Sequence, residues 1–406
     1  MSLAHFSLPA AERPLTSAAV ALRSVPRLKP TTEALPYAQL GAELDALKAR
    51  ISAELGAQDV LYVRRLDRFS RTMEAVGRVL IHVSFEPVAF GCGVLALWVH
   101  KQLQATEVGH SALHGAYDKL PGGEAFASKT FRWDTPIDEE SWRLGHNVKH
   151  HGNTNVAGKD PDIHFGPVRL TERTPHKLAH YAQLPLTLGV LFPNFGFMMN
   201  LHFTGLLDAY ADNGQPEGLD FLPDRSQKSR LLAWKRALRK YVPYYFKNYV
   251  VFPALAGPFF FKVLLGNWLA ELMRDVYSAA TIYCGHVGDD VHSFEHGTKA
   301  SSRGEWYAMQ IAASNDFEVS RPISILCGGL DRQIEHHLFP QLPPERLRQI
   351  APEVRAICER NGVHYKTASW PATLKKSLKQ IARLARNDPA SPAKTAGLRE
   401  VLRSMS

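Results

Sequence analysis

The sequence has few cysteines, and none of them forms a metal-binding or redox motif. Its 406 residues contain four, Cys92, Cys284, Cys327 and Cys358, which lie far apart without a CxxC pair. This spacing argues against a disulfide-stapled scaffold or a zinc ribbon, and it fits a reducing compartment. No RNP, zinc-finger or helix-turn-helix signature accompanies the formal charge of +9, so we expect no nucleic-acid partner.

Several catalytic signatures are missing as well. There is no HExxH, which argues against a zincin metalloprotease. A carboxylate di-iron bundle needs two ExxH motifs on partner helices, and only Glu107 to His110 supplies one. The chain has no flavin or nicotinamide fingerprint, no iron–sulfur cysteine set and no HPGG, so electrons for a redox reaction must come from a separate protein. The GCGVLA stretch at 91–96 lies in an apolar region, where close helix packing explains it better than dinucleotide binding.

No long apolar run is free of polar interruption, yet apolar residues are concentrated in three regions, 72–104, 184–208 and 249–285. Several windows approach the roughly 20 residues that a bilayer-spanning helix requires. The interruptions are Glu86, Lys262 and Asn267. A buried core helix is the alternative for any one window. Three such regions together favour membrane embedding, and long polar segments account for the mean hydropathy of −0.19.

Basic residues at 64–71 precede the first apolar region, and basic residues at 225–240 precede the last. Positive charge beside a membrane span favours a cytoplasmic location for both basic segments. Two topologies then remain open. In one, 184–208 and 249–285 each cross the bilayer once. In the other, 249–285 forms a hairpin around Gly266 while 184–208 lies in the interface.

Eighteen histidines are present, and several fall in clusters beside the apolar regions. HSALH spans 110–114, HNVKHH spans 146–151, and QIEHH spans 333–337. On an α-helix the four-residue spacing puts His146 and His150 on one face, as it does the HSALH pair. His151 is rotated by about 100° and can serve a different metal. Imidazole suits iron, zinc and copper, so the clusters predict a metal centre.

Neutral imidazoles need carboxylates or carbonyls to fix their orientation. Five residues near the clusters are candidates, although each is as well explained by a cap or a turn. They are Asp160, Asp162, Glu335, Asn315 and Asp316.

The three boxes, together with HNVKHHGNTNVAGKDPDI, IYCGH and GGLDRQIEHHLFPQLPPERL, resemble the integral-membrane fatty acid desaturases. The resemblance covers about residues 60–370 and is strongest to bacterial acyl-CoA Δ9 desaturases. It implies an all-α integral-membrane fold of about four transmembrane helices, with a cytosolic helical cap that holds a histidine-rich di-iron site.

Transferred by position, the resemblance implies eight iron ligands. They are His110, His114, His146, His150, His151, His286, His336 and His337. Gln333 stands where many relatives have a further histidine, and whether it binds iron directly, through water or not at all stays open. No side-chain acid or base is assigned.

The resemblance implies an O2-dependent enzyme with two iron ions that introduces a cis double bond, expected at Δ9, into a long-chain acyl-CoA or acyl lipid. Its electron donor would be a ferredoxin, a cytochrome b5 or a flavin and iron–sulfur reductase, for which residues 235–240 offer a basic docking surface. Such a protein is expected to cross the inner (cytoplasmic) membrane several times, with its active site facing the cytoplasm. The alternatives are a related di-iron hydroxylase or ketolase and, in another class, a metal-binding membrane transporter.

Four parts of the chain are expected. They are a disordered segment at 1–36, cytosolic amphipathic helices at 37–71, the membrane desaturase domain at 72–370, and a basic amphipathic helix with a mobile tail at 371–406. The last helix suits either an anionic membrane surface or packing against the protein itself.

Overall fold

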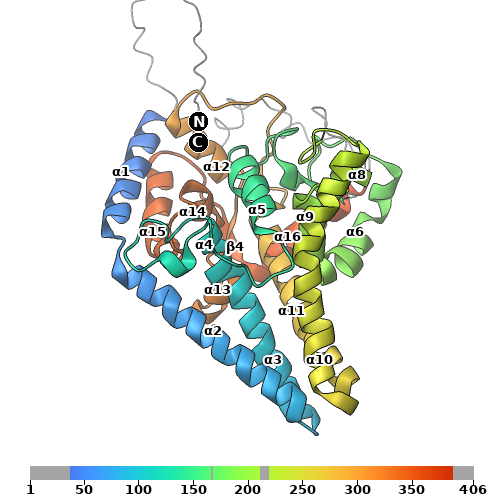
Figure 1. The fold of residues 1–406 in the computed structure, drawn as a ribbon. Helices are drawn as coiled ribbons and strands as arrows, with labels where there is room; N and C mark the ends of the chain where they lie inside the picture. The colour runs from blue at the N-terminus through green and yellow to red at the C-terminus, as the bar shows by residue number, and fades with distance from the viewer. Residues whose placement is uncertain (1–36, 166–167, 211–218, 387–406) are drawn as a thin grey trace, which may run out of the picture. The chain divides into compact units, whose positions relative to one another are not determined.

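The computed structural model describes residues 37–386, except 166–167 and 211–218, and these residues are mostly helical (Figure 1). The helical segments are α1 (Ala38–Glu54), α2 (Ala57–Val83), α3 (Pro87–Leu103), η1 (Gln104–His110), α4 (Ser111–Leu113), η2 (Glu124–Phe126), α5 (Glu139–Trp142), η3 (Arg143–His150), η4 (Pro161–Ile163), η5 (Leu178–Ala182), α6 (Gln183–Leu186), η6 (Thr187–Leu191), η7 (Phe192–Asn194), α7 (Phe195–Phe203), α8 (Leu206–Tyr210), α9 (Gln227–Phe246), η8 (Lys247–Val251), α10 (Phe252–Leu255), η9 (Gly257–Phe259), α11 (Phe260–His286), α12 (Arg303–Ala312), α13 (Arg321–Cys327), α14 (Gln333–Leu338), α15 (Pro344–Arg360) and α16 (Trp370–Leu384). Two short sheets pair β1 (His164–Phe165) with β2 (Val168–Arg169) and β3 (Asp316–Glu318) with β4 (Thr367–Ser369). The segments expected to be disordered or mobile, 1–36 and 387–406, lie outside the described residues.

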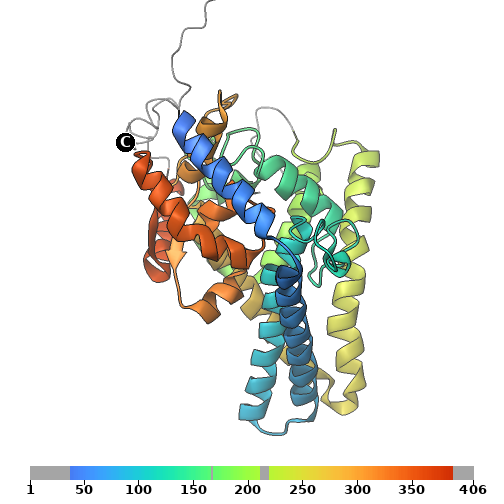
Figure 2. The same ribbon diagram turned by 90° about the vertical axis from the view of Figure 1, so that its left-hand side faces the viewer.

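The helices α2, α3, α9 with η8 and α10, and α11 extend together to one end of the described part (Figures 1 and 2). We call these helices the limb. Helix α2 packs along α3, α3 packs along α11, and α10 packs on α11. The other helices, which we call the cap, gather at the opposite end of the limb.

The polar interruptions in the apolar regions have structural roles in the limb. Glu86 lies in the α2–α3 turn and accepts a hydrogen bond from the Val88 N–H at 2.7 Å, so it caps α3. Lys262 donates to the carbonyl oxygens of His82 and Ser84, both at 2.8 Å, near the end of α2. Asn267 donates to the Asn248 carbonyl at 2.6 Å and so links α11 to η8.

Glycines allow α2 and α3 to approach closely. A Cβ on Gly77 would lie 2.7 Å from the Leu97 backbone nitrogen, and one on Gly93 would lie 2.9 Å from that of Ile81. The close packing expected for the GCGVLA stretch is therefore present at Gly93, whereas a Cβ on Gly91 would meet nothing within 4 Å.

The last apolar region does form a hairpin, but its turn is not at Gly266. The chain reverses between α10 and α11, at Ala256–Phe259, where Gly257 has φ +53°. Gly266 lies inside α11, facing Ile81, so that part of the expectation is wrong. Within the described residues, one stretch, Leu178–Phe203, is long and apolar enough to qualify as a membrane span by length and composition. The four expected transmembrane helices are therefore not established by this criterion.

Most of the cap surrounds the third histidine box. Helix α1 packs on α12 and α15, and its Leu40, Leu44 and Ile51 share a buried core with Ile334 of α14. Helix α16 packs on α11 through Ser377 and Ile381, which is the second of its two expected settings. The expected boundary at residue 71 falls inside α2.

Candidate metal centre

Four separate segments carry the box histidines to one place. His110 and His114 flank α4, the HNVKHH box closes η3, His286 ends α11, and the last pair lies in α14. The rings of His151 and His337 are 4.4 Å apart between centroids, and those of His110 and His336 are 4.8 Å apart. The structure therefore brings together all eight histidines that the boxes and the resemblance indicated.

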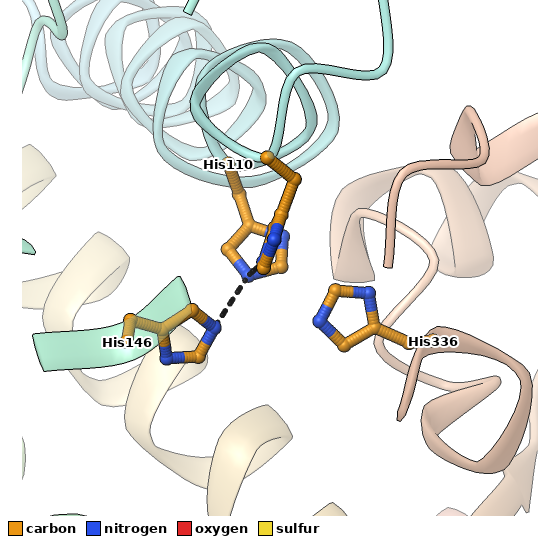
Figure 3. A group of neighbouring side chains, drawn as sticks. His110, His146 and His336 are labelled. Carbon is orange, nitrogen blue, oxygen red and sulfur yellow. Dashed lines mark hydrogen bonds between the residues drawn. The ribbon is translucent and has the colours of Figure 1, made fainter. Parts of the chain in front are cut away.

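The first group contains His110, His114, His146 and His336, each with a nitrogen within 4.8 Å of the others' (Figure 3). The Nε2 atom of His110 lies 3.3 Å from Nε2 of both His114 and His146. The Nε2 atom of His336 is buried without a hydrogen-bond partner. In Figure 3 the rings converge from different helices toward one region.

The second group contains His150, His286 and His337, again within 4.8 Å of one another. The Nε2 atoms of His286 and His337 are 3.1 Å apart, and the side-chain amide nitrogen of Gln333 lies 2.7 Å from His286 Nε2. Because the nitrogen and oxygen of an amide are assigned rather than observed, the Gln333 oxygen can face the same point. The Nε2 atom of His150 is buried and has no partner.

The second box departs from the expected α-helical geometry. Residues Arg143–His150 form a π-helical segment, and the His151 N–H donates to the His146 carbonyl at 3.0 Å. In a π-helix, residues five apart lie on the same side. The rings of His146 and His151 therefore face each other, and their Nε2 atoms are 3.2 Å apart. His150 joins His286 and His337 in the second group, but it also lies with His146 and His151 in a group whose nitrogens are within 4.8 Å of one another. The expected division of this box between two metals therefore stays a prediction.

Burial keeps most of these imidazoles neutral. Burial, reinforced by neighbouring imidazoles, holds the pKa of five of them well below its usual range: His110, His114, His151, His336 and His337. Neutral imidazole has a free lone pair, which is the form that binds a metal.

Two of the candidate carboxylates, Asp160 and Asp162, lie beside the imidazoles of the second box. Burial would lower the pKa of His150, but the carboxylates of Asp160 and Asp162 outweigh it and raise that pKa to about 9. The Nδ1 atom of His150 lies 3.0 Å from both Asp160 oxygens. Asp162 lies 3.6 Å from His146 Nδ1 and so faces both groups. A carboxylate at Nδ1 holds the proton there and leaves Nε2 free as a ligand.

The other three orientation candidates are placed differently. Asn315 donates its backbone N–H to the Gly285 carbonyl at 3.0 Å, beside His286. Asp316 accepts the Ile334 N–H at 2.9 Å at the start of α14, and Glu335 accepts from the Tyr365 hydroxyl at 3.0 Å. These contacts hold the backbone and flank of the ligand-bearing segments instead of orienting an imidazole ring.

Sequence reasoning missed Trp142, whose ring stacks on that of His146 at 4.5 Å between centroids, and two side chains within hydrogen-bond distance of a ring nitrogen. His337 Nδ1 lies 3.1 Å from the Thr154 hydroxyl and 3.3 Å from Gln310 Oε1, and Thr154 donates to that same oxygen at 2.9 Å. Both side chains are buried. They are distant from the third box in sequence, and no spacing rule connects them to it.

The distances between the ring nitrogens suit shared binding of a metal ion. Two nitrogens that bind one ion at about 2.1 Å lie roughly 3 to 3.4 Å apart. The Nε2–Nε2 distances of 3.1 to 3.3 Å match this geometry. The unpartnered Nε2 atoms of His150 and His336 also require a ligand. Glu107 is bound by Arg348 at 2.7 Å and by Tyr62 at 2.6 Å, so it is not part of the cluster. The histidine clusters could therefore hold metal.

Two adjoining cavities of about 90 and 60 Å³ reach the cluster. Both are bordered by Asp162, Phe195, Met199, Ile282 and His286. Most of the remaining wall is apolar; Trp133, Ile137 and Phe203 line one cavity, and Phe165 and Leu170 line the other. Two small, mainly apolar cavities that share one wall therefore lie beside the histidines, with the charged pair Arg274 and Asp275 at the edge of the larger one.

The chain is similar to known proteins over most of its length. The model of the family described as fatty acid desaturase matches residues 86–369. An NADPH-dependent stearoyl-CoA 9-desaturase of Mycobacterium tuberculosis is 31% identical over 356 residues, which are 86% of this chain and 80% of that protein. An sn-1 linoleoyl-lipid 6-desaturase of Synechocystis is 27% identical over 70% of this chain and 78% of its own length. Human fatty acid desaturase 3 is 22% identical over 74% of this chain and 63% of its own. The chain therefore belongs to the fatty acid desaturase family and is an oxidoreductase of that family.

Proposed function

We propose that this protein is an O2-dependent desaturase that introduces a cis double bond at Δ9 of a long-chain fatty acyl-CoA, using two iron ions bound by the eight histidines. The observation that carries the proposal is the convergence of buried, largely neutral imidazoles into two groups beside two mainly apolar cavities. The name of the mycobacterial relative supports the CoA carrier and the Δ9 position.

The reaction must balance. One O2 takes up two electrons from a donor, two protons from water, and two hydrogen atoms from adjacent methylenes, which carry the other two electrons and two protons, and it leaves as two water molecules. The two carbons that lose hydrogen become the alkene. No amino-acid side chain oxidises an unactivated methylene, so the iron pair supplies the oxidising power.

The protein contributes position and a dry environment. The two cavities, which share Phe195, Met199 and Ile282, would hold the acyl chain in an extended path beside the histidines. Asp160 holds a proton on His150 Nδ1, and Gln310 with Thr154 does the same for His337, so the Nε2 atoms remain aimed at the iron pair. Gln333 is placed to complete the second group.

We place the apolar regions 72–104 and 249–285 of the limb in the bilayer, and α1, α12–α16 and the basic start of α9 on the cytoplasmic side of the inner membrane. Many of the exposed large apolar side chains lie on limb helices, including Val79, Val83, Val250, Phe261 and Trp268. Among described residues, α1 and α12–α16 contribute no exposed large apolar side chain. An apolar surface of this extent favours lipid contact over water.

Expression in a bacterial host that lacks unsaturated fatty acids, followed by lipid mass spectrometry, tests the proposal. We expect monounsaturated chains with the double bond at carbon 9. His336→Ala should abolish them, whereas His364→Ala, at an exposed histidine outside the boxes, should not. Hydroxylated or oxo-lipids would instead indicate the related hydroxylase or ketolase. No lipid product from iron-loaded protein supplied with a working donor would refute an enzymatic role on lipids.

A further inference from the structure

A separate cleft of about 600 Å³ opens on the cap between α1, α12 and the loops that follow the first and third histidine boxes. Its lining includes Gly115 and Leu338, which directly follow His114 and His337 in the chain. The cleft therefore reaches within one residue of ligands from both groups. It shares no lining residue with the two cavities assigned to the acyl chain.

Aromatic side chains connect the wall of this cleft to α14. Trp306 lines the cleft, and its ring lies 5.2 Å from that of the buried Tyr307. Tyr307 lies 6.0 Å from Phe339, which is two residues beyond His337. Because electron transfer weakens steeply with distance, closely spaced rings and a short covalent route to the ligands favour transfer from this surface.

The charge of the cleft is mainly positive. Lys48, Lys119 and Arg303 line it. The Arg303 guanidinium lies 4.9 Å from the Trp306 ring centroid and also pairs with Asp45 at 3.4 Å, so Lys48 and Lys119 carry most of the uncompensated charge of the cleft. Asp118 also lines it, but its carboxylate accepts hydrogen bonds from the Ser128 backbone and hydroxyl at 2.7 and 2.6 Å. An acidic protein surface would complement this charge.

The basic stretch expected to serve as the docking surface is less suitable. Within 235–240, Arg239 forms ion pairs with Asp138 at 2.7 Å and Glu140 at 3.1 Å, and Lys240 pairs with Glu139 at 2.6 Å. These two charges are therefore already compensated within the protein.

We propose that this cleft, lined by Lys48, Lys119, Arg303 and Trp306, docks an acidic one-electron carrier protein that reduces the metal centre. The inference rests on the proposed function and deepens it by naming the partner's surface. Each docked carrier gives up one electron and leaves oxidised. Two such transfers supply the two donor electrons that one turnover consumes, while water supplies the two protons.

The test uses the full-length iron-loaded protein and a reduced plant-type [2Fe–2S] ferredoxin as the acidic probe. Stopped-flow absorbance follows its oxidation by the desaturase at increasing ionic strength. The variant K48Q/K119Q/R303Q removes three charges from the cleft. The matched control K228Q/R230Q/K235Q removes three from the exposed face of α9.

We expect the cleft variant to slow ferredoxin oxidation by at least tenfold at low salt and to flatten its salt dependence. The control should stay within about twofold of the wild type. Dithionite should reduce all three proteins equally, and O2 should then give equal single-turnover product, which shows that the cleft variant is folded and loaded.

Equal slowing of both variants, or no slowing of the cleft variant, would overturn the docking site. So would a wild-type centre that dithionite reduces but ferredoxin does not. If dithionite-reduced wild type gave no unsaturated product with O2, the proposed function would have failed instead, independently of the docking result.

Discussion

At the scale of single residues, the centre depends on side chains that bind the Nδ1 atoms of the imidazoles and so fix the orientation of Nε2. Asp160 was found by its closeness to the second box, because short sequence separation limits where a side chain can reach. Gln310 and Thr154 could not be found in this way. Gln310 reaches His337 because α12 packs against α14, and Thr154 reaches it from the loop after η3. Spacing rules cannot identify side chains that orient a ligand from a distant segment of the chain.

We predict that Gln310→Leu weakens iron binding by about 10- to 100-fold, which is the usual effect of removing an outer hydrogen-bond partner. Leucine cannot accept the hydrogen bond from His337 Nδ1, so its ring loses a fixed tautomer and orientation. Competitive chelator titration followed by iron analysis measures this loss. Gln349→Leu, at an exposed position on α15, provides the control. Equal iron affinity in the two variants would contradict the role of Gln310.

At the scale of elements, the sequence locates the histidine boxes but not the helix type that carries them. The spacing in HNVKHH suggests α-helical pairing of His146 with His150, whereas the π-helical turn pairs His146 with His151. Nothing in the residues of 143–150 signals the wider turn; only packing of four segments around shared ligands selects it. The turn could have been placed from the sequence, because Gly257 is followed by Pro258, a Gly-Pro turn signal that Gly266 lacks. Contact with Ile81 keeps Gly266 inside a helix.

The close contact of α2 with α3 gives a second prediction. Gly93→Leu should destabilise the protein by about 1 to 3 kcal/mol, because the new side chain has no room against the Ile81 backbone. Thermal unfolding in detergent, monitored by circular dichroism, would report this as a lower midpoint. Gly91→Leu, which meets open space two residues away, should leave the midpoint nearly unchanged. Because leucine has a higher helix propensity than glycine, a similar loss in both variants would contradict the close-packing explanation.

A third prediction concerns the link between α15 and η1. Arg348 and Glu107 form a buried ion pair, so Arg348→Met should cost about 3 to 5 kcal/mol by leaving a buried carboxylate without its partner. The double variant E107Q/R348M should recover most of that stability, since no charge then remains unpaired. Chemical denaturation of the solubilised proteins compares the three. Failure of the double variant to recover would show that packing, rather than charge, dominates at this contact.

At the scale of the whole molecule, sequence composition indicated membrane embedding but not its geometry. The polar residues Glu86, Lys262 and Asn267 made the ends of the membrane spans hard to predict from hydropathy. In the structure each of them caps a limb helix or links two limb helices. These roles depend on which helices are neighbours, and composition alone does not contain that information.

If the limb lies in lipid, a charge on its exposed surface should hinder insertion. Val79 is 57% exposed on α2, and Val79→Arg should cost about 3 kcal/mol if that position is near the bilayer centre. The folded yield in carbonate-washed membranes should fall accordingly. Ala46→Arg, exposed on cap helix α1, should have no comparable effect. Equal yields would place the limb outside the hydrocarbon region.

The central claim is that eight imidazoles enclose two iron ions, and metal analysis of the purified protein tests it most directly. Mass spectrometric quantification should give two irons per chain and little zinc. That content should fall sharply in both His110→Ala and His150→Ala, one from each histidine group. A wild-type protein that is folded and catalytically competent but contains zinc, or a single iron, would contradict the account.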